Sequence, residues 1–231
     1  MIEERASNLT TDAKVIAIDG SSASGKGTLA RSIAEKLNWR ILDSGSIYRV
    51  IGLVAKRYNL LEKEQLLIKK IGDIDIQFLK HGCFVDDEDV SEQIRTEEVG
   101  KLASTIAAYP NLRSEVLDLQ RGFRKAPGLV ADGRDMGTVV FPEAEVKFFL
   151  EASAETRAQR RYNELKNKGF DVTLPLLLEE ILDRDARDRE RSVAPLRPAD
   201  DSILIDSSQL SAFEVAELAL NTLEQKGIYR K

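Results

Sequence analysis

The sequence predicts an α/β fold in which helices flank a parallel sheet, because short apolar runs alternate with longer segments of helical periodicity. The runs predicted to be buried strands are residues 15–19, 40–43, 128–132, 146–150 and 203–206. Strands that alternate with helices are joined by right-handed crossovers, which makes the strands parallel. Ligands of such sheets bind at the carboxyl ends of the strands. The residues that follow each run are therefore the first candidates for a functional site.

Apolar residues at helical spacing follow most of these strands. Leu29, Ile33 and Leu37 fall on one face of the first predicted helix. The predicted helices cover residues 26–37, 46–58, 62–71, 96–108, 112–125, 156–168, 174–191 and 212–226. The alternating residues 73–91, with a turn at His81 and Gly82, are typical of a β-hairpin.

This change of periodicity predicts the domain organisation. We expect a flexible polar leader at residues 1–13 and a single domain over residues 14–231. An inserted subdomain is expected at about residues 66–105, which leaves residues 14–65 and 106–231 as the core.

Composition excludes several classes of protein. Hydrophobic residues make up 42% of the 231 residues and charged residues 32%, which is typical of a globular rather than a disordered chain. The net charge of −5 argues against a nucleic-acid partner. Cys83 is the only cysteine, so no intrachain disulfide can form, and we interpret it as a small residue in a strand. Without an apolar run of membrane-spanning length or a signal-peptide core, we expect a cytoplasmic protein with no membrane partner.

Residues 20–28, between the first strand and the first helix, have the pattern of a phosphate-binding loop. Glycines let backbone N–H groups point at phosphate oxygens, and the helix N-terminus adds partial positive charge. The predicted ATP-binding residues of the loop are Gly20, Ser21, Ser22, Ala23, Ser24, Gly25, Lys26, Gly27 and Thr28. The strict motif has a hydroxyl residue directly after the lysine, where this chain has Gly27. Direct ligation of Mg²⁺ by Thr28 is therefore left open.

The loop alone predicts only that a nucleoside triphosphate binds. A GTPase would carry the base-reading motif Asn-Lys-x-Asp, and residues 167–170, Asn-Lys-Gly-Phe, lack its aspartate. A transporter-type ATPase would carry Leu-Ser-Gly-Gly, which the sequence does not contain. These two classes are therefore disfavoured.

Arginine and carboxylate residues gather in three further segments, at residues 43–49, 131–137 and 183–191. Transfer of a phosphoryl group between two anions requires such positive charge, and arginine binds phosphate oxygens in pairs. In the third segment, the spacing places four residues on one helix face: Arg184, Arg187, Asp188 and Arg191. That face could bind a phosphate and a sugar hydroxyl, or the segment could be a solvated helix with i,i+4 ion pairs. Asp132 could hold a Mg²⁺-bound water or simply cap its strand.

Taken together, these segments resemble the bacterial cytidylate kinase family. The motifs are residues 20–28, DSGSIYR (43–49), RTEEVGKLAS (95–104), ADGRDMGTVVFP (131–142) and RDARDRERSVAPL (184–196), in that order and at suitable spacing from about Val15 to Asp206. The resemblance implies a P-loop NTPase core with a five-stranded parallel sheet, a monophosphate-binding insert and a mobile lid at about residues 157–170. It also implies ATP with Mg²⁺ as donor, CMP and dCMP as acceptors, and a monomer.

The resemblance also assigns roles to individual residues. It implies that Ser44 contacts the nucleotide, that Arg49, Arg134 and Arg191 hold phosphate, and that Arg184 and Asp188 meet the ribose hydroxyls. It implies that Ser104, Arg113 and Asp135 read the cytosine edge, where a carboxylate facing the amino group disfavours uracil. Three arginines of the lid, Arg157, Arg160 and Arg161, would close over ATP. For at least one of them the alternative is a position on a charged surface helix. The predicted catalytic residues are Lys26, Asp132, Arg134, Arg184 and Arg191, with Mg²⁺ near Thr28 and Asp132.

Two other functions are alternatives to this one. A P-loop kinase for a small alcohol would need neither the insert nor three acceptor segments. A nucleotide-regulated binding module would hydrolyse ATP slowly, with no increase when CMP is added. A DNA-binding role is weaker still because of the acidic net charge.

Overall fold

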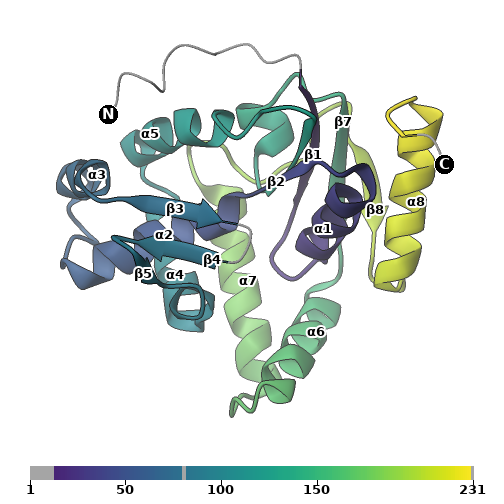
Figure 1. The fold of residues 1–231 in the computed structure, drawn as a ribbon. Helices are drawn as coiled ribbons and strands as arrows, with labels where there is room; N and C mark the ends of the chain where they lie inside the picture. Colours follow the sequence, from purple (N-terminus) through teal and green to yellow (C-terminus); the bar gives the residue numbers. More distant parts are fainter. Residues whose placement is uncertain (1–12, 80–81, 230–231) are drawn as a thin grey trace. The chain divides into compact units, whose positions relative to one another are not determined.

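The computed structural model describes residues 13–79 and 82–229, which form two compact units (Figure 1). The first unit contains the chain up to Leu42, Gln120–Glu190 and the chain from Ala194 onward. The second contains Asp43–Leu119 and Arg191–Val193. The predicted leader, apart from residue 13, and the predicted turn at His81 lie outside the described residues. The predicted insert falls inside the second unit, which is longer at both ends, and its role in monophosphate binding stays a prediction.

The first unit is built on the predicted parallel sheet of five strands, in the order β2-β6-β1-β7-β8. The strands are β1 (Lys14–Gly20), β2 (Arg40–Asp43), β6 (Gly128–Gly133), β7 (Val146–Glu151) and β8 (Ile203–Asp206). β1 pairs in parallel with β6 and β7, and β7 pairs in parallel with β8. In this register Asp19 lies opposite both Gly133 and Phe149, so the carboxyl ends of three strands meet at one edge.

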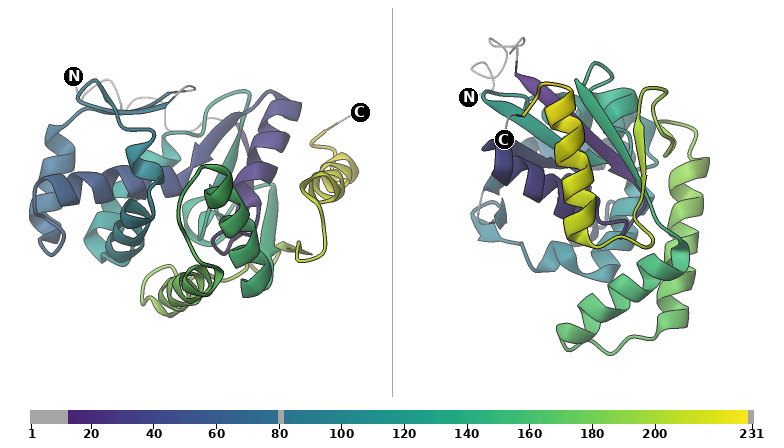
Figure 2. Two further views of the ribbon diagram at one scale, coloured as in Figure 1. Left: turned by 90° about the horizontal axis from the view of Figure 1, so that it is seen from below. Right: turned by 90° about the vertical axis from the view of Figure 1, so that its right-hand side faces the viewer.

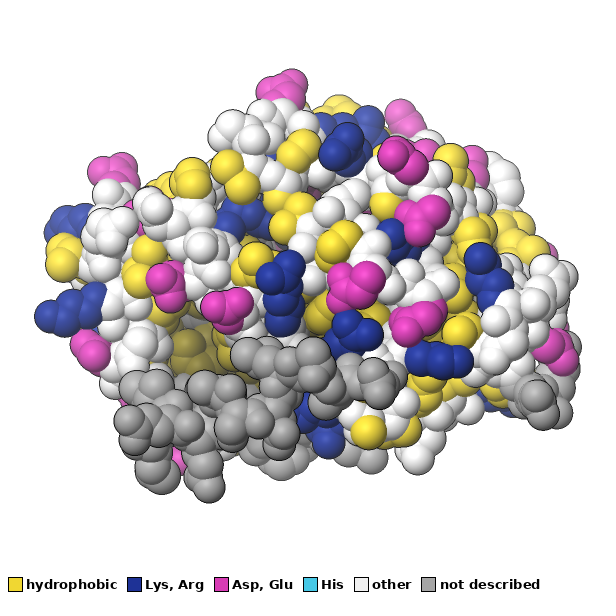
Figure 3. All heavy atoms as spheres, turned by 90° about the horizontal axis from the view of Figure 1, so that it is seen from above, with side chains coloured by type: hydrophobic (Ala, Val, Ile, Leu, Met, Phe, Trp, Pro, Cys, Tyr) yellow, Lys and Arg dark blue, Asp and Glu magenta, His cyan; other side chains and the backbone are white. Residues whose placement is uncertain are grey.

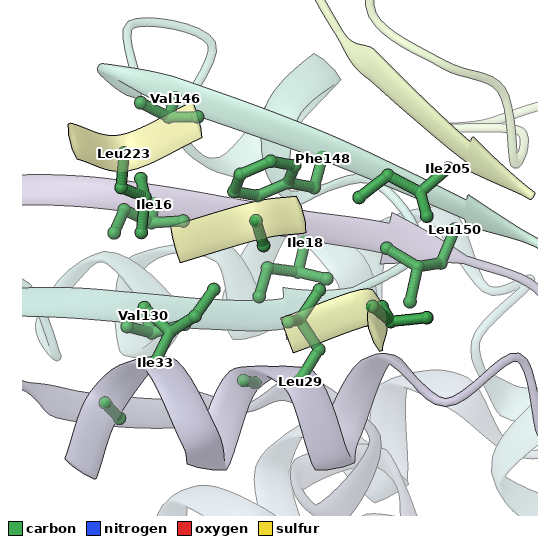
Figure 4. Packing of buried hydrophobic residues seen from close by; sticks show 14 residues of the cluster. Ile16, Ile18, Leu29, Ile33, Val130, Val146, Phe148, Leu150, Ile205 and Leu223 are labelled. Carbon is green, nitrogen blue, oxygen red and sulfur yellow. The ribbon is translucent and has the colours of Figure 1, made fainter. Parts of the chain in front are cut away.

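The core of the first unit lies between the sheet and two helices, α1 (Lys26–Leu37) and α8 (Ala212–Gln225) (Figure 4). Ile16, Ile18 and Phe148 project from the strands toward Leu29 and Ile33 of α1. On the other face of β1, the side chains of Val15 and Ala17 are also 0% exposed. β1 is thus covered on both faces, which explains why its sequence is continuously apolar rather than alternating.

Two further helices of the first unit, α6 (Ala154–Asn167) and α7 (Leu174–Glu190), pack side by side (Figure 2). Ser153 caps α6 by accepting a hydrogen bond from the Thr156 amide. The prediction that α7 extends to Arg191 is wrong by one residue. The helix ends at Glu190, so Arg191 is not on it and cannot be placed by helical spacing.

The second unit contains four helices and a small antiparallel sheet among its described residues. The helices are α2 (Ser44–Arg57), α3 (Glu64–Asp73), α4 (Glu97–Ile106) and α5 (Pro110–Arg121), whose last two residues fall in the first unit; a 3₁₀ turn η2 (Gln93–Arg95) precedes α4. The predicted hairpin is confirmed as β3 (Ile76–Leu79) and β4 (Gly82–Val85), and β5 (Glu88–Asp89) adds a third strand. Cys83 lies in β4 as a free, half-buried thiol, as predicted.

Helices α2 and α4 approach closely because Gly52 has no side chain. A Cβ atom at Gly52 would lie 3.1 Å from the amide nitrogen of Ala103. This contact fixes α4, and therefore Ser104, beside α2.

Two features of the structure concern the partners considered from the sequence: the distribution of surface charge and the apolar length of the helices. On the face drawn in Figure 3, Lys and Arg side chains are interspersed with Asp and Glu, so this face offers no single basic patch. Within the described ranges, no helix combines the length and the apolar character that crossing a membrane requires.

Candidate functional site

The loop between β1 and α1 has the backbone geometry of an anion-binding nest. Gly20, Ala23 and Gly25 have φ angles of +150°, +59° and +97°. A Cβ atom at Gly20 would collide with the carbonyl oxygen of Leu150 on β7, so only glycine fits there. Gly25 is the N-cap residue of α1. Because glycine has no side chain, it gives the first amides of the helix no side-chain hydrogen bond. Amides arranged in this way bind phosphate oxygens.

Lys26 is folded over this loop. Its side chain is 8% exposed, and its Nζ atom donates to the carbonyl oxygen of Ser21 at 3.0 Å. The ammonium group therefore already lies at the loop where phosphates would bind. Ser24 is 0% exposed, and its Oγ atom has no hydrogen-bond partner among the described residues.

The position after Lys26 departs from the strict motif for a steric reason. A Cβ atom at Gly27 would lie 3.1 Å from Oδ2 of Asp132, which is buried near the end of β6. A hydroxyl residue at this position would press against the Asp132 carboxylate. The glycine thus makes room for a carboxylate beside the phosphate loop.

The described residues contain no group of three or more His, Cys, Asp or Glu side chains that could hold a metal ion. A divalent cation at this loop would therefore need phosphate and water oxygens as most of its ligands. That is how Mg²⁺ is usually bound beside nucleotides, with one or two carboxylates. Asp132 and the Thr28 hydroxyl fit that donor set.

Arg157 of α6 is hydrogen-bonded to the loop. Its Nη1 atom donates to the carbonyl oxygen of Ser22 at 3.3 Å, and its Nε atom donates to that of Ala152 at 2.9 Å. The same guanidinium makes a two-pronged ion pair with Asp185 of α7. Only 4% of the Arg157 side chain is exposed, so the alternative of a charged surface helix is wrong for this residue. Arg161 fits that alternative better, since it forms an ion pair with Glu164 of its own helix.

Arg160, one turn after Arg157, contacts the other end of the loop. Its Nη1 atom donates to the Ser24 carbonyl oxygen at 3.4 Å and to Ser207 Oγ at 3.1 Å. Ser207 Oγ donates in turn to the Ser24 carbonyl at 2.9 Å. The loop carbonyls are therefore held by groups from α6 and from the segment after β8.

Beside the loop lies a cavity of about 260 Å³, which the sequence did not predict. It is lined by Ser24, Gly25, Thr28, Leu29, Arg160, Ser207, Leu210, Ser211, Ala212 and Val215. Residues 207–212 carry no motif in the sequence. They join the site only because β8 lies beside β7 at the edge of the sheet.

Helix α7 presents two of the predicted residues one turn apart. Arg184 donates from Nη1 to Ser22 Oγ at 3.3 Å, and Asp188 accepts from Arg134 Nε at 2.8 Å. Arg187 differs from them, because it is exposed and donates to the Asp183 carbonyl of its own helix. The predicted four-residue face is therefore wrong: of its members, Arg184 and Asp188 contact other predicted site residues, whereas Arg187 turns back to its own helix and Arg191 lies beyond the helix end. Asp185 and Asp188 pair with Arg157 and Arg134 on other elements, which disfavours a helix held by i,i+4 pairs alone.

The Arg134–Asp188 pair is largely buried, with 16% and 7% of the two side chains exposed. Burial acts to lower the pKa of Arg134, but Asp188, Asp132 and Asp185 raise it, and the net shift is upward. The guanidinium therefore stays charged and can bind an anion.

The segment after β6 contains a feature that the sequence did not predict. Residues Met136–Val140 form a π-helix, η3, whose preceding residue Asp135 is 2% exposed. Asp19, at the end of β1, accepts hydrogen bonds from the Met136 and Gly137 amides at 2.8 Å each. Burial raises the pKa of Asp19 to about 7, against the effect of these two amides.

The second unit carries the other predicted acceptor residues. Arg49 donates from Nη1 to the carbonyl oxygens of Ile94 and Thr96, at 2.6 and 3.1 Å. Ser104 is 6% exposed, and its Oγ atom has no hydrogen-bond partner in the described part of the chain. Arg113, also buried, donates to the Ala107 carbonyl and lies 5.7 Å from the centre of the Tyr48 ring. Ser44, buried at the start of α2, and Arg191 also belong to this unit.

Comparison with known proteins agrees with the motifs. A family model described as Cytidylate kinase matches residues 16–225. Over 219 residues, the chain is 54% identical to the cytidylate kinase of Aeromonas hydrophila, covering 93% of this chain and 95% of that one. With the same coverage, it is 52% identical to the cytidylate kinase of Aeromonas salmonicida. It is also 52% identical to the cytidylate kinase of Photobacterium profundum, over 94% of this chain and 97% of that one.

Proposed function

The chain belongs to the cytidylate kinase family, and on this premise we propose that it transfers the γ-phosphoryl group of ATP to CMP, and to dCMP as well. The products are ADP and CDP or dCDP. The observation that carries the proposal is the loop of residues 20–28, whose backbone geometry and buried lysine suit a triphosphate, in a chain that matches the family model from residue 16 to 225.

The donor nucleotide is assigned to the first unit. Its phosphates lie on the loop amides and Lys26, and its nucleoside part has room in the cavity of about 260 Å³ beside Thr28 and Arg160. Asp132 and Thr28 would hold Mg²⁺ together with the phosphates. When bound, the ion would neutralise negative charge on the β- and γ-phosphoryl groups. Arg157 supports the loop, since its guanidinium is already used by Ser22, Ala152 and Asp185.

The acceptor nucleotide is assigned to the residues that carry the family's other motifs. Ser104, Arg113 and Asp135 read the cytosine edge, and the buried Ser104 hydroxyl and Arg113 guanidinium support this role. Arg49, Arg134 and Arg191 hold the acceptor phosphate. Arg184 and Asp188 contact the ribose hydroxyls, and Asp188 also orients Arg134 through their ion pair.

The transfer itself needs no side-chain base. An oxygen of the CMP phosphate attacks the γ-phosphorus in line, and the bond from that phosphorus to the bridging oxygen of ADP breaks. The attacking oxygen is already largely ionised near neutral pH, because the second pKa of a phosphate monoester is about 6. Lys26 and the arginines lower the barrier by stabilising the charge that spreads over the transferred group.

The test is ADP release from ATP by purified protein in the presence of CMP, dCMP, UMP or AMP. We expect rapid release with CMP and dCMP and much slower release with UMP and AMP. A kinase for a small alcohol would show no dependence on any monophosphate. A nucleotide-regulated binding module would release ADP slowly, at a rate unchanged by CMP. Either result would overturn the proposal.

A cytoplasmic location and a monomeric state remain predictions from the sequence. Sedimentation of the purified protein with and without both nucleotides tests the second of these. A stable dimer would contradict it.

A further inference from the structure

Asp19 is a buried carboxylate that the proposed reaction does not use. It lies at the end of β1, directly before the phosphate loop, and is 4% exposed. Its Oδ1 atom accepts from the Met136 amide and its Oδ2 atom from the Gly137 amide, both at 2.8 Å. Both oxygens thus hold the backbone of a segment more than 100 residues away in the sequence. Burying a carboxylate is costly unless it is hydrogen-bonded, which these two amides provide.

The segment that Asp19 holds is the π-helix η3, a rare and short element that is frequently found at functional sites. Its other end is held by Arg121, which donates to the carbonyl oxygens of Val140 and Val139 at 3.1 and 3.3 Å. A carboxylate at the amide end and a guanidinium at the carbonyl end both complement the peptide dipoles. A single turn of helix is thereby fixed at its two ends from β1 and α5.

The hydrogen bonds of η3 begin at Asp135. The carbonyl oxygen of Asp135 accepts from the amides of Val139 and Val140, at 2.9 and 3.1 Å. Its backbone conformation, φ −145° and ψ 23°, is that of the residue from which the turn starts. If η3 moved, the backbone of Asp135 would move with it. Gly133 allows this tight path, since a Cβ atom there would lie 2.7 Å from Met136 Cε.

From this arrangement we propose that Asp19 and Arg121 are positioning residues for recognition of the acceptor base. They hold the two ends of η3 and so fix the direction in which Asp135 projects. Neither contacts the substrate. The inference rests on the proposed function, because Asp135 is there the residue that accepts a hydrogen bond from the cytosine amino group.

The test is steady-state kinetics of Asp19→Asn and Arg121→Met with each substrate varied in turn. Asparagine keeps the shape of aspartate but offers one acceptor oxygen, and its NH₂ group would face an amide N–H. For Asp19→Asn we expect KM for CMP to rise about 10- to 100-fold, the effect of losing a buried hydrogen bond to a charged group. KM for ATP should change less than about twofold, and the preference for CMP over UMP should fall. Arg121→Met should change the same two quantities in the same direction.

Glu145→Gln is the matched control, because Glu145 is an exposed carboxylate of the first unit that also accepts a backbone hydrogen bond, from the Val15 amide at 2.6 Å, at the opposite end of β1 from Asp19. It should leave both KM values unchanged. The double variant Asp19→Asn with Arg121→Met should show less than the sum of the two single effects, since both act through one element. The amide resonances of Met136 and Gly137 should shift in Asp19→Asn whether or not the enzyme is active.

The proposal is overturned if folded Asp19→Asn raises the KM values for ATP and CMP equally, which would place its effect on the phosphate loop. It is overturned equally if Arg121→Met leaves both KM for CMP and the CMP preference unchanged, and this variant decides the question should Asp19→Asn fail to fold. Failure of the wild-type protein to phosphorylate CMP would instead refute the proposed function. That outcome can be told apart, because the two amide resonances report on η3 without any turnover.

Discussion

Arg134 has both a structural role and a proposed catalytic role. Its Nε atom is bound to Asp188, and its charge is secured by three nearby carboxylates. We expect Arg134→Ala to lower kcat by about 10²- to 10³-fold, the cost of removing one preorganised donor to transition-state charge. Arg189→Ala is the control, since Arg189 follows Asp188 on α7 but is 56% exposed. Near-normal turnover of a folded Arg134→Ala protein would refute the assigned role.

A pH dependence of stability follows from Asp19. Its folded-state pKa of about 7 lies above the ordinary value of 3.8, so the folded protein binds the proton more tightly than the unfolded chain. This contribution to stability is complete below about pH 4 and is lost as the pH rises to about 7. Asparagine does not titrate. The free energy of unfolding of Asp19→Asn should therefore rise relative to wild type between pH 4 and 7, measured in urea at fixed salt. A difference that stays constant across this window would contradict the shifted pKa.

At the scale of elements, α6 and α7 are joined by the Arg157–Asp185 pair, with 4% and 13% of the two side chains exposed. Removing one partner of a buried pair typically costs about 3–5 kcal/mol, whereas replacing both by apolar residues is often neutral. Arg157→Met should therefore destabilise the fold by about that amount, and Arg157→Met with Asp185→Leu should recover much of it. KM for ATP should rise in Arg157→Met and stay raised in the double variant, because neither protein can form the hydrogen bond to the Ser22 carbonyl.

Denaturant unfolding and ATP kinetics are measured on three proteins: the wild type, Arg157→Met, and Arg157→Met with Asp185→Leu. Lys166→Met on α6 is the stability control, because its exposed pair with Asp171 is worth about 1 kcal/mol or less. Recovery of ATP affinity in the double variant would show that Arg157 acts only by joining the helices, not by supporting the loop.

The elements also show what sequence can and cannot predict. The alternation of apolar runs and helical segments predicted the sheet and its helices because each pattern is local, and the contiguous residues 20–28 predicted the phosphate loop. β5 is only two residues long, too short to have a periodicity. The contacts of Arg160 with Ser207, and of Asp19 with η3, join residues 47 and more than 100 positions apart. Such pairs depend on which strands become neighbours, which no local pattern specifies.

Across the whole molecule, the phosphate loop and two of the residues assigned to cytosine belong to different compact units. The loop of residues 20–28 belongs to the first unit, whereas Ser104 and Arg113 belong to the second. Amide hydrogen exchange at residues 20–28 and around Ser104 and Arg113 can therefore report on ATP and on CMP separately, because a ligand that binds only the folded form slows local opening in the residues it contacts.

We expect a nonhydrolysable ATP analogue alone to slow exchange at the amides of residues 20–28, and CMP alone to slow it around Ser104 and Arg113 on α4 and α5. At 100 times its Kd, each ligand should also add about 2.7 kcal/mol to the free energy of unfolding. UMP at the same concentration is the control and should protect α4 and α5 less. The reason is that Ser104, Arg113 and Asp135 are proposed to read the cytosine edge, and uracil lacks its amino group. If CMP slowed exchange only in the first unit, the base site would have to be sought there, and the roles of Ser104 and Arg113 would be refuted.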